Sequence, residues 1–292
     1  MATLRELKGR IGSVASSEKI TGAMKMISSA KMHKAEMALR QLRPFRDQIE
    51  SIIANLLGSD ATFESPLMTP HASLQKMAVV VWGSDDGLCG AYNVNIFKQL
   101  LALTSDLRAS LGQEVEITVF PVGGKMAKAV RKLKLPNVSV EIPAGVDSKT
   151  EEVRDFTWKL RDSYLDGTFD RVDVLYMSFK SAGRQRLEHK SLLPVTLDSF
   201  NLQGKETTEK PYIFEPSPNA IFGRVLPMYL LSVVQDIFTE NRASECAARV
   251  MAMQSANDNA QKLHEQLQLE FNKLRQQAIT TELLDILGGQ VR

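Results

Sequence analysis

The chain has 292 residues, of which 43% are hydrophobic and 24% are charged, which is the composition of an ordinary globular protein with one or two domains. A net charge of +2 at pH 7 does not indicate a nucleic-acid-binding protein, and two cysteines provide neither a disulfide framework nor a four-ligand zinc site. No apolar run approaches the roughly 20 residues of a membrane span, and the first residues lack the apolar core of a signal peptide, so we expect a cytoplasmic chain.

Residues 1–57 are predicted to form one long helix. They hold ten Lys and Arg residues against five Asp and Glu, a net charge of +5, which indicates an acidic partner. Pro44 is expected to kink or restart the helix. Apolar residues recur every three or four positions, the spacing of a coiled coil. They are Leu4, Leu7, Ile11, Val14, Met32, Ala35, Leu39, Leu42, Ile49, Ile53 and Leu56.

One part of this helix breaks the apolar pattern. The register is predicted to fail between Glu18 and Ser28, because polar residues occupy the next expected positions. The apolar stripe shifts instead to Ile20, Met24 and Ile27, as it does at a stutter in a coiled coil. We therefore expect a local change of packing in this stretch.

The middle of the chain alternates strand and helix patterns. Short β-branched runs predict strands at 76–82, 115–122, 137–142, 172–181 and 186–195. Helical patterns lie between them at about 91–112, 124–134 and 149–166. This alternation predicts a small α/β domain with a largely parallel sheet, and its last strands are expected to pair in antiparallel fashion at one edge.

The last part of the chain returns to long helix, from about 221 to 287. Its apolar residues again recur at spacings of three or four. They are Met253, Ala256, Ala260, Leu263, Leu267, Phe271, Leu274 and Ala278. Because a small domain cannot cover two such long helices, they are expected to pair with each other as an antiparallel coiled coil, with the α/β domain at one end.

Few motifs suggest chemistry. In the turn SDDGLCG, Asp85 and Asp86 could hold Mg²⁺, and Gly87 and Gly90 could cradle a phosphate. The alternative is a tight turn with Cys89 as a small buried side chain. The chain lacks GxGxxG and a complete phosphate loop, and its four histidines do not pair at metal-ligand spacing. No catalytic arrangement can be argued from these residues.

Several segments resemble the gamma subunit family of F-type ATP synthases. The similarity runs in order along the whole chain. It lies in KITGAMKMISSAKMHKAE (19–36), SDDGLCGAYN (84–93), YIFEPSP (212–218), SECAARVMAMQSANDNAQKL (244–263) and NKLRQQAITTELLDIL (272–287). Three features depart from the family pattern, one of which is the ending GGQVR in place of a small and apolar ending. Asp86 stands where a basic residue is common, and His264 stands where an apolar residue is usual.

The resemblance implies a definite fold. The N-terminal and C-terminal helices would form a long antiparallel two-helix coiled coil, with a small Rossmann-like α/β domain inserted between them. The expected domains are the first helix at 1–58, the α/β domain at 74–200 and the last helix at 217–292.

The resemblance also implies a function and a set of partners. The coiled coil would be the rotor shaft inside three alternating pairs of nucleotide-binding alpha and beta subunits. The α/β domain would rest on the membrane c-ring beside an epsilon subunit. The shaft would have no catalytic site, cofactor or metal and would bind no nucleic acid. It would reach the membrane only through partners, at the cytoplasmic face of a bacterial inner membrane.

The same resemblance assigns contacts with the surrounding ring. The expected contact residues are Met24, Lys25, Arg249, Gln276, Thr280 and Glu282. Arg249 is favoured most among them, because its planar guanidinium can bind a carboxylate through two hydrogen bonds. Without the resemblance, the first two would be interpreted as a stutter packed on the partner helix and the others as ordinary helix surface. The alternative function is a small-molecule enzyme with an open α/β domain and helical oligomerisation arms.

Overall fold

The chain forms two compact units. A computed structural model describes residues 3–58, 63–112, 114–132, 135–143, 150–200 and 213–289. The helical unit consists of Met1–Ala30 and Arg249–Arg292, and the α/β unit consists of Lys31–Ala248.

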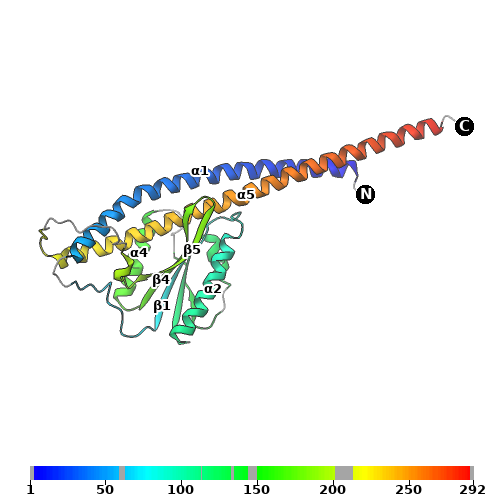
Figure 1. The fold of residues 1–292 in the computed structure, drawn as a ribbon. Helices are drawn as coiled ribbons and strands as arrows, with labels where there is room; N and C mark the ends of the chain where they lie inside the picture. Colours follow the sequence, from blue (N-terminus) through cyan, green and yellow to red (C-terminus); the bar gives the residue numbers. More distant parts are fainter. Residues whose placement is uncertain are drawn as a thin grey trace. The chain divides into compact units, whose positions relative to one another are not determined.

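Two long helices begin and end the described chain, as the sequence predicts (Figure 1). Helix α1 spans Leu4–Leu57 and helix α5 spans Pro218–Gly289. The expectation that Pro44 restarts the first helix is wrong, because α1 continues through it. Pro44 lies on the exposed side of α1, where water can bond to the carbonyl that loses its amide donor.

The seam of α1 keeps a single heptad register. In the helical unit, positions 4, 7, 11, 14, 18, 21, 25 and 28 are all buried or half-buried. The same spacing continues in the α/β unit at 32, 35, 39, 42, 46, 49, 53 and 56. The predicted stutter is therefore wrong. The polar residues between Glu18 and Ser28 occupy seam positions themselves, and Ile20 and Ile27 lie outside the seam.

The α/β unit contains a five-stranded sheet. Its strands are β1 (Lys76–Trp82), β2 (Glu116–Val122), β3 (Val138–Val140), β4 (Arg171–Ser181) and β5 (Arg184–Leu193). Their order is β3-β2-β1-β4-β5, in which the first four are parallel and β5 is antiparallel to β4. This confirms the predicted parallel sheet with an antiparallel edge.

Helices cover both faces of this sheet (Figure 1). They are α2 (Tyr92–Leu111), α3 (Gly124–Val130) and α4 (Thr150–Leu165), and a short 3-10 turn, η1, spans Leu197–Ser199. The third helix and the third strand are shorter than predicted. The helix ends at Val130 instead of about residue 134, and the strand pairs over only three residues.

Alternate residues of β1 enter two separate hydrophobic cores, because successive side chains of a strand point to opposite faces. Met77, Val79 and Val81 pack with α2 and α3. Ala78, Val80 and Trp82 pack with α4 and with the first turns of α5. The sheet is thus covered on both faces, and α5 forms part of one layer.

Helix α5 departs from the expectation that no segment is apolar enough for a membrane span. An 18-residue window within Pro218–Leu287 reaches a mean hydropathy of 1.4, which is apolar enough by composition for a membrane span. Half of that window is buried inside the protein. Phe222, Leu226 and Leu230 belong to the core beneath the sheet, so the apolar composition of this helix serves packing within the α/β unit.

Candidate functional site

The helical unit is an antiparallel pair formed by the beginning of α1 and the end of α5. Thr21 Oγ1 lies 3.2 Å from Asn257 Oδ1, and Glu18 Oε2 lies 3.8 Å from His264 Nδ1. The pairing is antiparallel because the lower α1 number contacts the higher α5 number. These polar pairs cross the seam, which is why the heptad register continues here without apolar residues.

The apolar seam predicted for α5 is wrong at one position. The sequence places Leu263 in the seam, but Leu263 is exposed and His264 is half-buried beside Glu18. The other predicted positions at 253, 256, 260, 267, 271, 274 and 278 are buried or half-buried. The departure from the family pattern at His264 is thus a polar seam position.

Apolar side chains of α1 point away from this seam. Ile20 is 63% exposed, Met26 is 69% exposed and Ile27 is 51% exposed. Between Glu18 and Ser28, these apolar residues of α1 therefore lie outside the seam, while polar residues occupy its seam positions. Isolated exposed apolar residues are common, but three within eight positions of one helix form a surface suited to a partner.

The predicted contact residues near this surface differ in exposure. Met24 and Lys25 are half-buried, and Lys25 occupies a seam position. Arg249 is 5% exposed and is engaged in an interaction within the chain. Its guanidinium is therefore not presented as a free surface group, and a ring contact through Arg249 would involve a largely buried side chain.

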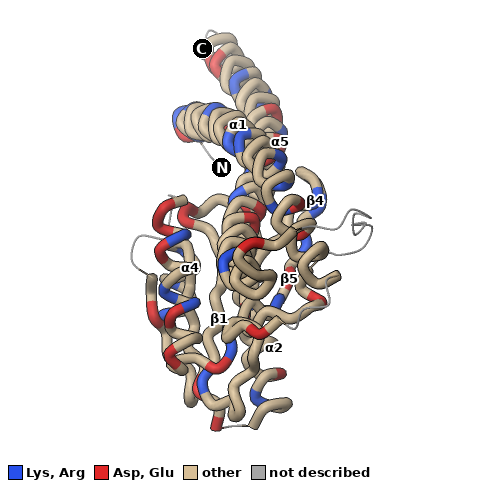
Figure 2. Tube along the Cα trace, turned by 90° about the vertical axis from the view of Figure 1, so that its left-hand side faces the viewer, with Lys and Arg blue, Asp and Glu red and all other residues tan. Residues whose placement is uncertain are grey.

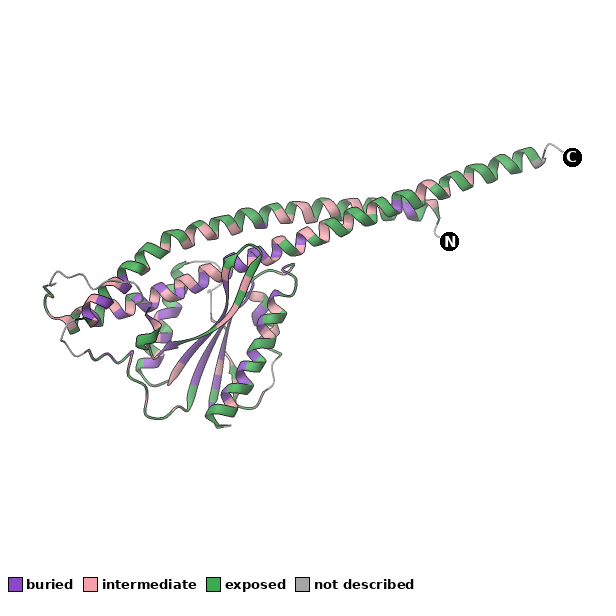
Figure 3. Ribbon diagram, viewed as in Figure 1, coloured by how far each residue is buried: buried purple, intermediate pink, exposed green. Residues whose placement is uncertain are grey.

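The other three predicted residues lie on the exposed end of α5. Gln276, Thr280 and Glu282 are all exposed, and the Thr280 hydroxyl donates to the Gln276 carbonyl at 2.9 Å within the helix. Figure 1 shows this end of α5 extending past the N-terminal end of α1, and Figure 3 shows it coloured mostly as exposed.

Sequence reasoning missed the apolar side chains of this free end as a candidate contact surface. They are 50 to 63% exposed: Ile279, Leu283, Leu284, Ile286 and Leu287. Their spacing continues a helical stripe for at least two turns beyond the last half-buried residue, Ala278. The available signal was a length difference. The apolar pattern at the end of the last helix has no counterpart in the first helix to pair with.

Charge is also uneven along the helices. Lys and Arg recur along α1, as Figure 2 shows in blue, in keeping with the net charge of +5 over residues 1–57. Such residues mostly form a solvated face, since an exposed ion pair contributes about 0–1 kcal/mol. They add a long-range attraction to an acidic surface without fixing one geometry.

The SDDGLCG turn is tied to its own domain. Asp85 Oδ1 accepts a hydrogen bond from the Gly124 amide at 3.1 Å, and Asn93 Nδ2 donates to Ser84 Oγ at 2.6 Å. Cys89 is buried, as the tight-turn interpretation predicts. Within the described residues, no group of three His, Cys, Asp or Glu side chains is placed to hold a metal ion.

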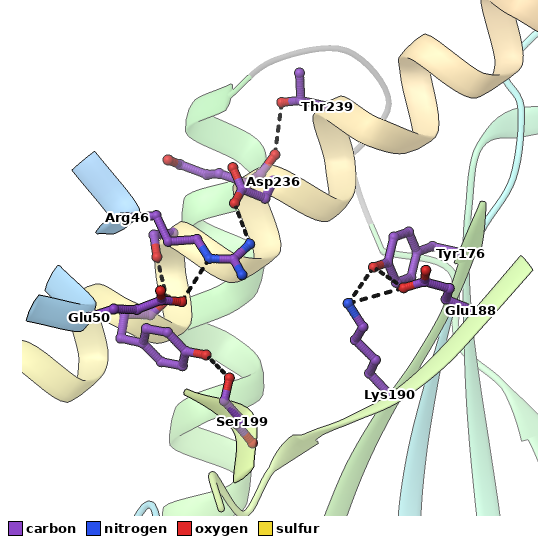
Figure 4. A network of polar contacts seen from close by, with 11 residues as sticks. Arg46, Glu50, Tyr176, Glu188, Lys190, Ser199, Asp236 and Thr239 are labelled. Atoms are coloured by element: carbon purple, nitrogen blue, oxygen red, sulfur yellow. Dashed lines mark hydrogen bonds and ion pairs between the residues drawn. The ribbon is translucent and has the colours of Figure 1, made fainter. Parts of the chain in front are cut away.

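A partly buried polar network joins elements of the α/β unit (Figure 4). Arg46 of α1 lies between Glu50 and Asp236, with Nε 3.0 Å from Glu50 Oε1 and Nη1 2.9 Å from Asp236 Oδ2. Burial raises the pKa of Asp236 above its ordinary value despite the Arg46 hydrogen bond. On the strands, the Tyr176 hydroxyl donates to Glu188 at 3.0 Å and accepts from Lys190 at 2.8 Å. These contacts are internal and fix α1, α5 and β5 in place.

Comparisons with known proteins agree with this architecture. Residues 3–291 match the family model described as ATP synthase. The ATP synthase gamma chain of Bacteroides thetaiotaomicron is 38% identical over 301 residues, and that of Bacteroides fragilis is 39% identical over 293, each alignment covering 100% of both chains. A chain of the Euglena gracilis mitochondrial ATP synthase has the same fold, with a TM-score of 0.65 at 19% identity, covering 99% of this chain and 93% of that one. The chain belongs to the ATP synthase gamma chain family.

Proposed function

We propose that this chain is the rotor shaft, or central stalk, of a proton-translocating F-type ATP synthase. The observation that carries the proposal is the apolar surface of the helical unit. Ile20, Met26 and Ile27 face outward from α1, and the end of α5 exposes a second apolar stripe. A helix pair with these side chains in water would be poorly soluble, so the proposal places it inside a surrounding ring of subunits.

The proposed mechanism is mechanical. One face of the helical unit is apolar around Ile20 and Ile27, and other faces carry lysines, so each rotational angle presents a different surface to a given neighbour. A neighbour that binds one face more tightly than another is shifted between open and closed states as the shaft turns. The shaft itself performs no chemistry. It is a coupling subunit of the ATP synthase complex, without a cofactor or a metal.

The partners follow from this role. Three alpha and three beta nucleotide-binding subunits would surround the helical unit, and an epsilon subunit and the membrane c-ring would contact the α/β unit. The complex would lie at the cytoplasmic face of a bacterial inner membrane, and this chain would reach the membrane only through those partners. Nucleic acid has no part in the proposal.

The proposed ring contacts are Met24, Lys25, Arg249, Gln276, Thr280 and Glu282. Of these, Gln276, Thr280 and Glu282 are supported by their exposure, and they lie beside the apolar stripe of the free end of α5. Met24 and Lys25 are half-buried next to the exposed Met26. Polar contacts at the edge of an apolar surface give orientation, and the apolar centre gives most of the binding free energy.

Reconstitution tests the proposal. The purified chain alone is expected to hydrolyse ATP at a negligible rate. Added to the alpha and beta subunits, it is expected to raise their steady ATPase activity strongly. A chain shortened to remove residues 244–292 is the control, since it lacks the paired part of α5. ATP hydrolysis by the isolated chain at the rate of the whole complex would refute the proposal, as would equal activation by the shortened chain.

A further inference from the structure

In many open α/β sheets, ligands bind at the carboxyl ends of two neighbouring strands where the strand order reverses. In this chain those strands are β1 and β4. From β1 the chain proceeds through β2 to β3 on one side, and it then crosses back to β4 on the other side of β1. Such a reversal leaves a crevice between the two strands at their carboxyl ends. In this chain the corresponding position lies at Gly83, which directly follows β1, and at Met177 on β4, and α5 contacts both residues.

Helix α5 contacts both strands at this position through polar side chains. Asn241 Nδ2 donates to the Gly83 carbonyl at 2.9 Å. Ser244 Oγ donates to the Met177 carbonyl at 3.0 Å. The pairing of Val81 with Leu175 puts Gly83 and Met177 at the same level of the two neighbouring strands. Asn241 and Ser244 are three residues apart and thus share one face of α5.

A third element joins the same contact. The hydroxyl of Tyr92, at the start of α2, donates to Asn241 Oδ1 at 2.7 Å and also lies 3.1 Å from the Asn241 carbonyl. Asn241 therefore uses its amide nitrogen toward β1 and its amide oxygen toward α2. Tyr92 is 4% exposed, Asn241 is 3% exposed and Ser244 is 0% exposed. We call Tyr92, Asn241 and Ser244 the buried joint.

The buried joint has a directional character that the hydrophobic contacts beside it lack. The hydrophobic effect depends on the buried area and not on direction, so apolar contacts fix the position of α5 only through the shapes of the packed side chains. Hydrogen bonds require a narrow range of distance and angle, and a buried carbonyl that loses its donor leaves an unsatisfied polar group. Three such bonds therefore resist rotation and sliding of α5 against the sheet.

We propose that the buried joint transmits torque between the five-stranded sheet and α5. This inference rests on the proposed rotor function. In many open α/β sheets this edge binds a small molecule, whereas here it binds α5. Tyr92, Asn241 and Ser244 are positioning residues, because they act on ATP synthesis only by holding α5 in a fixed rotational position on the sheet.

The experiment compares two pairs of substitutions in the assembled, membrane-bound complex. The joint pair is Tyr92→Phe with Ser244→Ala. The control pair is Tyr164→Phe with Ser232→Ala, which removes the same two hydroxyls from equally buried positions. The Tyr164 hydroxyl donates to the Thr69 carbonyl inside the α/β unit, and Ser232 Oγ donates to the Tyr229 carbonyl inside α5.

Two quantities are measured in membrane vesicles: the rate of ATP hydrolysis without a proton gradient, and the steady proton gradient that hydrolysis maintains. The joint pair is expected to keep the hydrolysis rate measured without a gradient and to lose part of the gradient. The reason is that α5 is expected to move against the sheet only when rotation works against the proton gradient. The control pair is expected to keep both. Hydrogen exchange of the α5 backbone amides around Asn241 and Ser244 should be about thirtyfold faster in the joint pair, because two ordinary hydrogen bonds that hold this part of α5 are lost together.

An equal gradient for the two pairs at equal hydrolysis rates would overturn the inference. If the joint pair does not assemble, the single variants Tyr92→Phe and Ser244→Ala decide the matter by the same comparison with Tyr164→Phe and Ser232→Ala. Failure of the proposed function appears differently. In that case the unsubstituted chain would neither assemble with the nucleotide-binding subunits nor support a gradient.

Discussion

Glu240 of α5 shows how burial acts on a single carboxyl group. Burial raises its pKa above the ordinary value of 4.5, although a hydrogen bond from Ser178 and the charges of Lys190 and Lys180 lower it. Glu188 adds to the increase. One of its oxygens, Oε2, is buried and has no hydrogen-bond partner among the residues that the structure describes. The folded state therefore holds this proton more tightly than the unfolded state.

This difference predicts how stability changes with pH. As the pH rises above 4.5, Glu240 of the unfolded chain loses its proton first, so its contribution to the stability of the folded state falls until the pH passes the raised pKa. Glu240→Gln removes that titration. Urea unfolding of the chain at a series of pH values should show a smaller decrease of stability above pH 4.5 in the variant. An unchanged pH dependence would contradict the role of Glu240.

Gly83 is a position at which the backbone must approach a neighbour closely. A Cβ added at Gly83 would lie 2.4 Å from Cβ of Met126, a fully buried residue of α3. Gly83→Ala is therefore expected to destabilise the α/β unit by about 1–3 kcal/mol, as overpacked cores do. Gly183→Ala is the control, since nothing lies within 4 Å of the added Cβ. Thermal unfolding of both variants would test this, and equal midpoints would contradict it.

At the scale of elements, hydrophobic periodicity predicted the two long helices and all five strands. It failed between Glu18 and Ser28, where the period of the helix does not change but the residues at its seam do. Thr21 and Glu18 have partners across the seam, so polar residues satisfy the same positions that apolar residues occupy elsewhere. A pattern of hydrophobicity alone cannot separate a shifted seam from a polar one.

The two ends of the helical unit should respond differently to truncated side chains. Leu7 is 0% exposed, so Leu7→Ala should destabilise the helix pair by about 2–5 kcal/mol. Leu283 is 56% exposed, so Leu283→Ala should change the stability of the chain by about 0.5 kcal/mol or less. Circular dichroism during urea unfolding measures both. A larger loss for Leu283 than for Leu7 would show that the end of α5 is paired within the chain.

Deletions of α5 offer a second prediction at this scale. Removal of residues 283–292 should reduce assembly or torque less than removal of residues 244–263. The first deletion removes the exposed residues 283–287 and the five residues after them, whereas the second removes seam positions, Ser244 of the buried joint and Arg249. ATPase activity of the complex at matched assembly measures the difference. Equal losses of activity would contradict the ranking.

At the scale of the whole molecule, the order of helix and strand patterns sufficed for the fold class, because each segment had one dominant period. The family resemblance led to contact residues such as Gln276 and Thr280. The exposed apolar residues, such as Ile20 and Ile286, could not be assigned to the surface from the pattern alone. Their exposure depends on the pairing of two helices that are far apart in the sequence and of different length.

The buried joint could not be predicted from the sequence either. Tyr92 and Ser244 lie in the segments 84–93 and 244–263 that resemble the gamma subunit family, but neither segment indicates this contact. The three residues meet only because α5 crosses the carboxyl ends of β1 and β4. Their placement depends on sheet order and strand register, which a single sequence does not fix to within one residue.

The measurement that tests the rotor assignment most directly is the composition of the native complex. The tagged chain would be isolated from native membranes, and the copies of each associated protein would be counted by mass spectrometry. The rotor function predicts two large nucleotide-binding subunits at three copies each for every copy of this chain. Recovery of the chain alone, or only as a homo-oligomer, would contradict it.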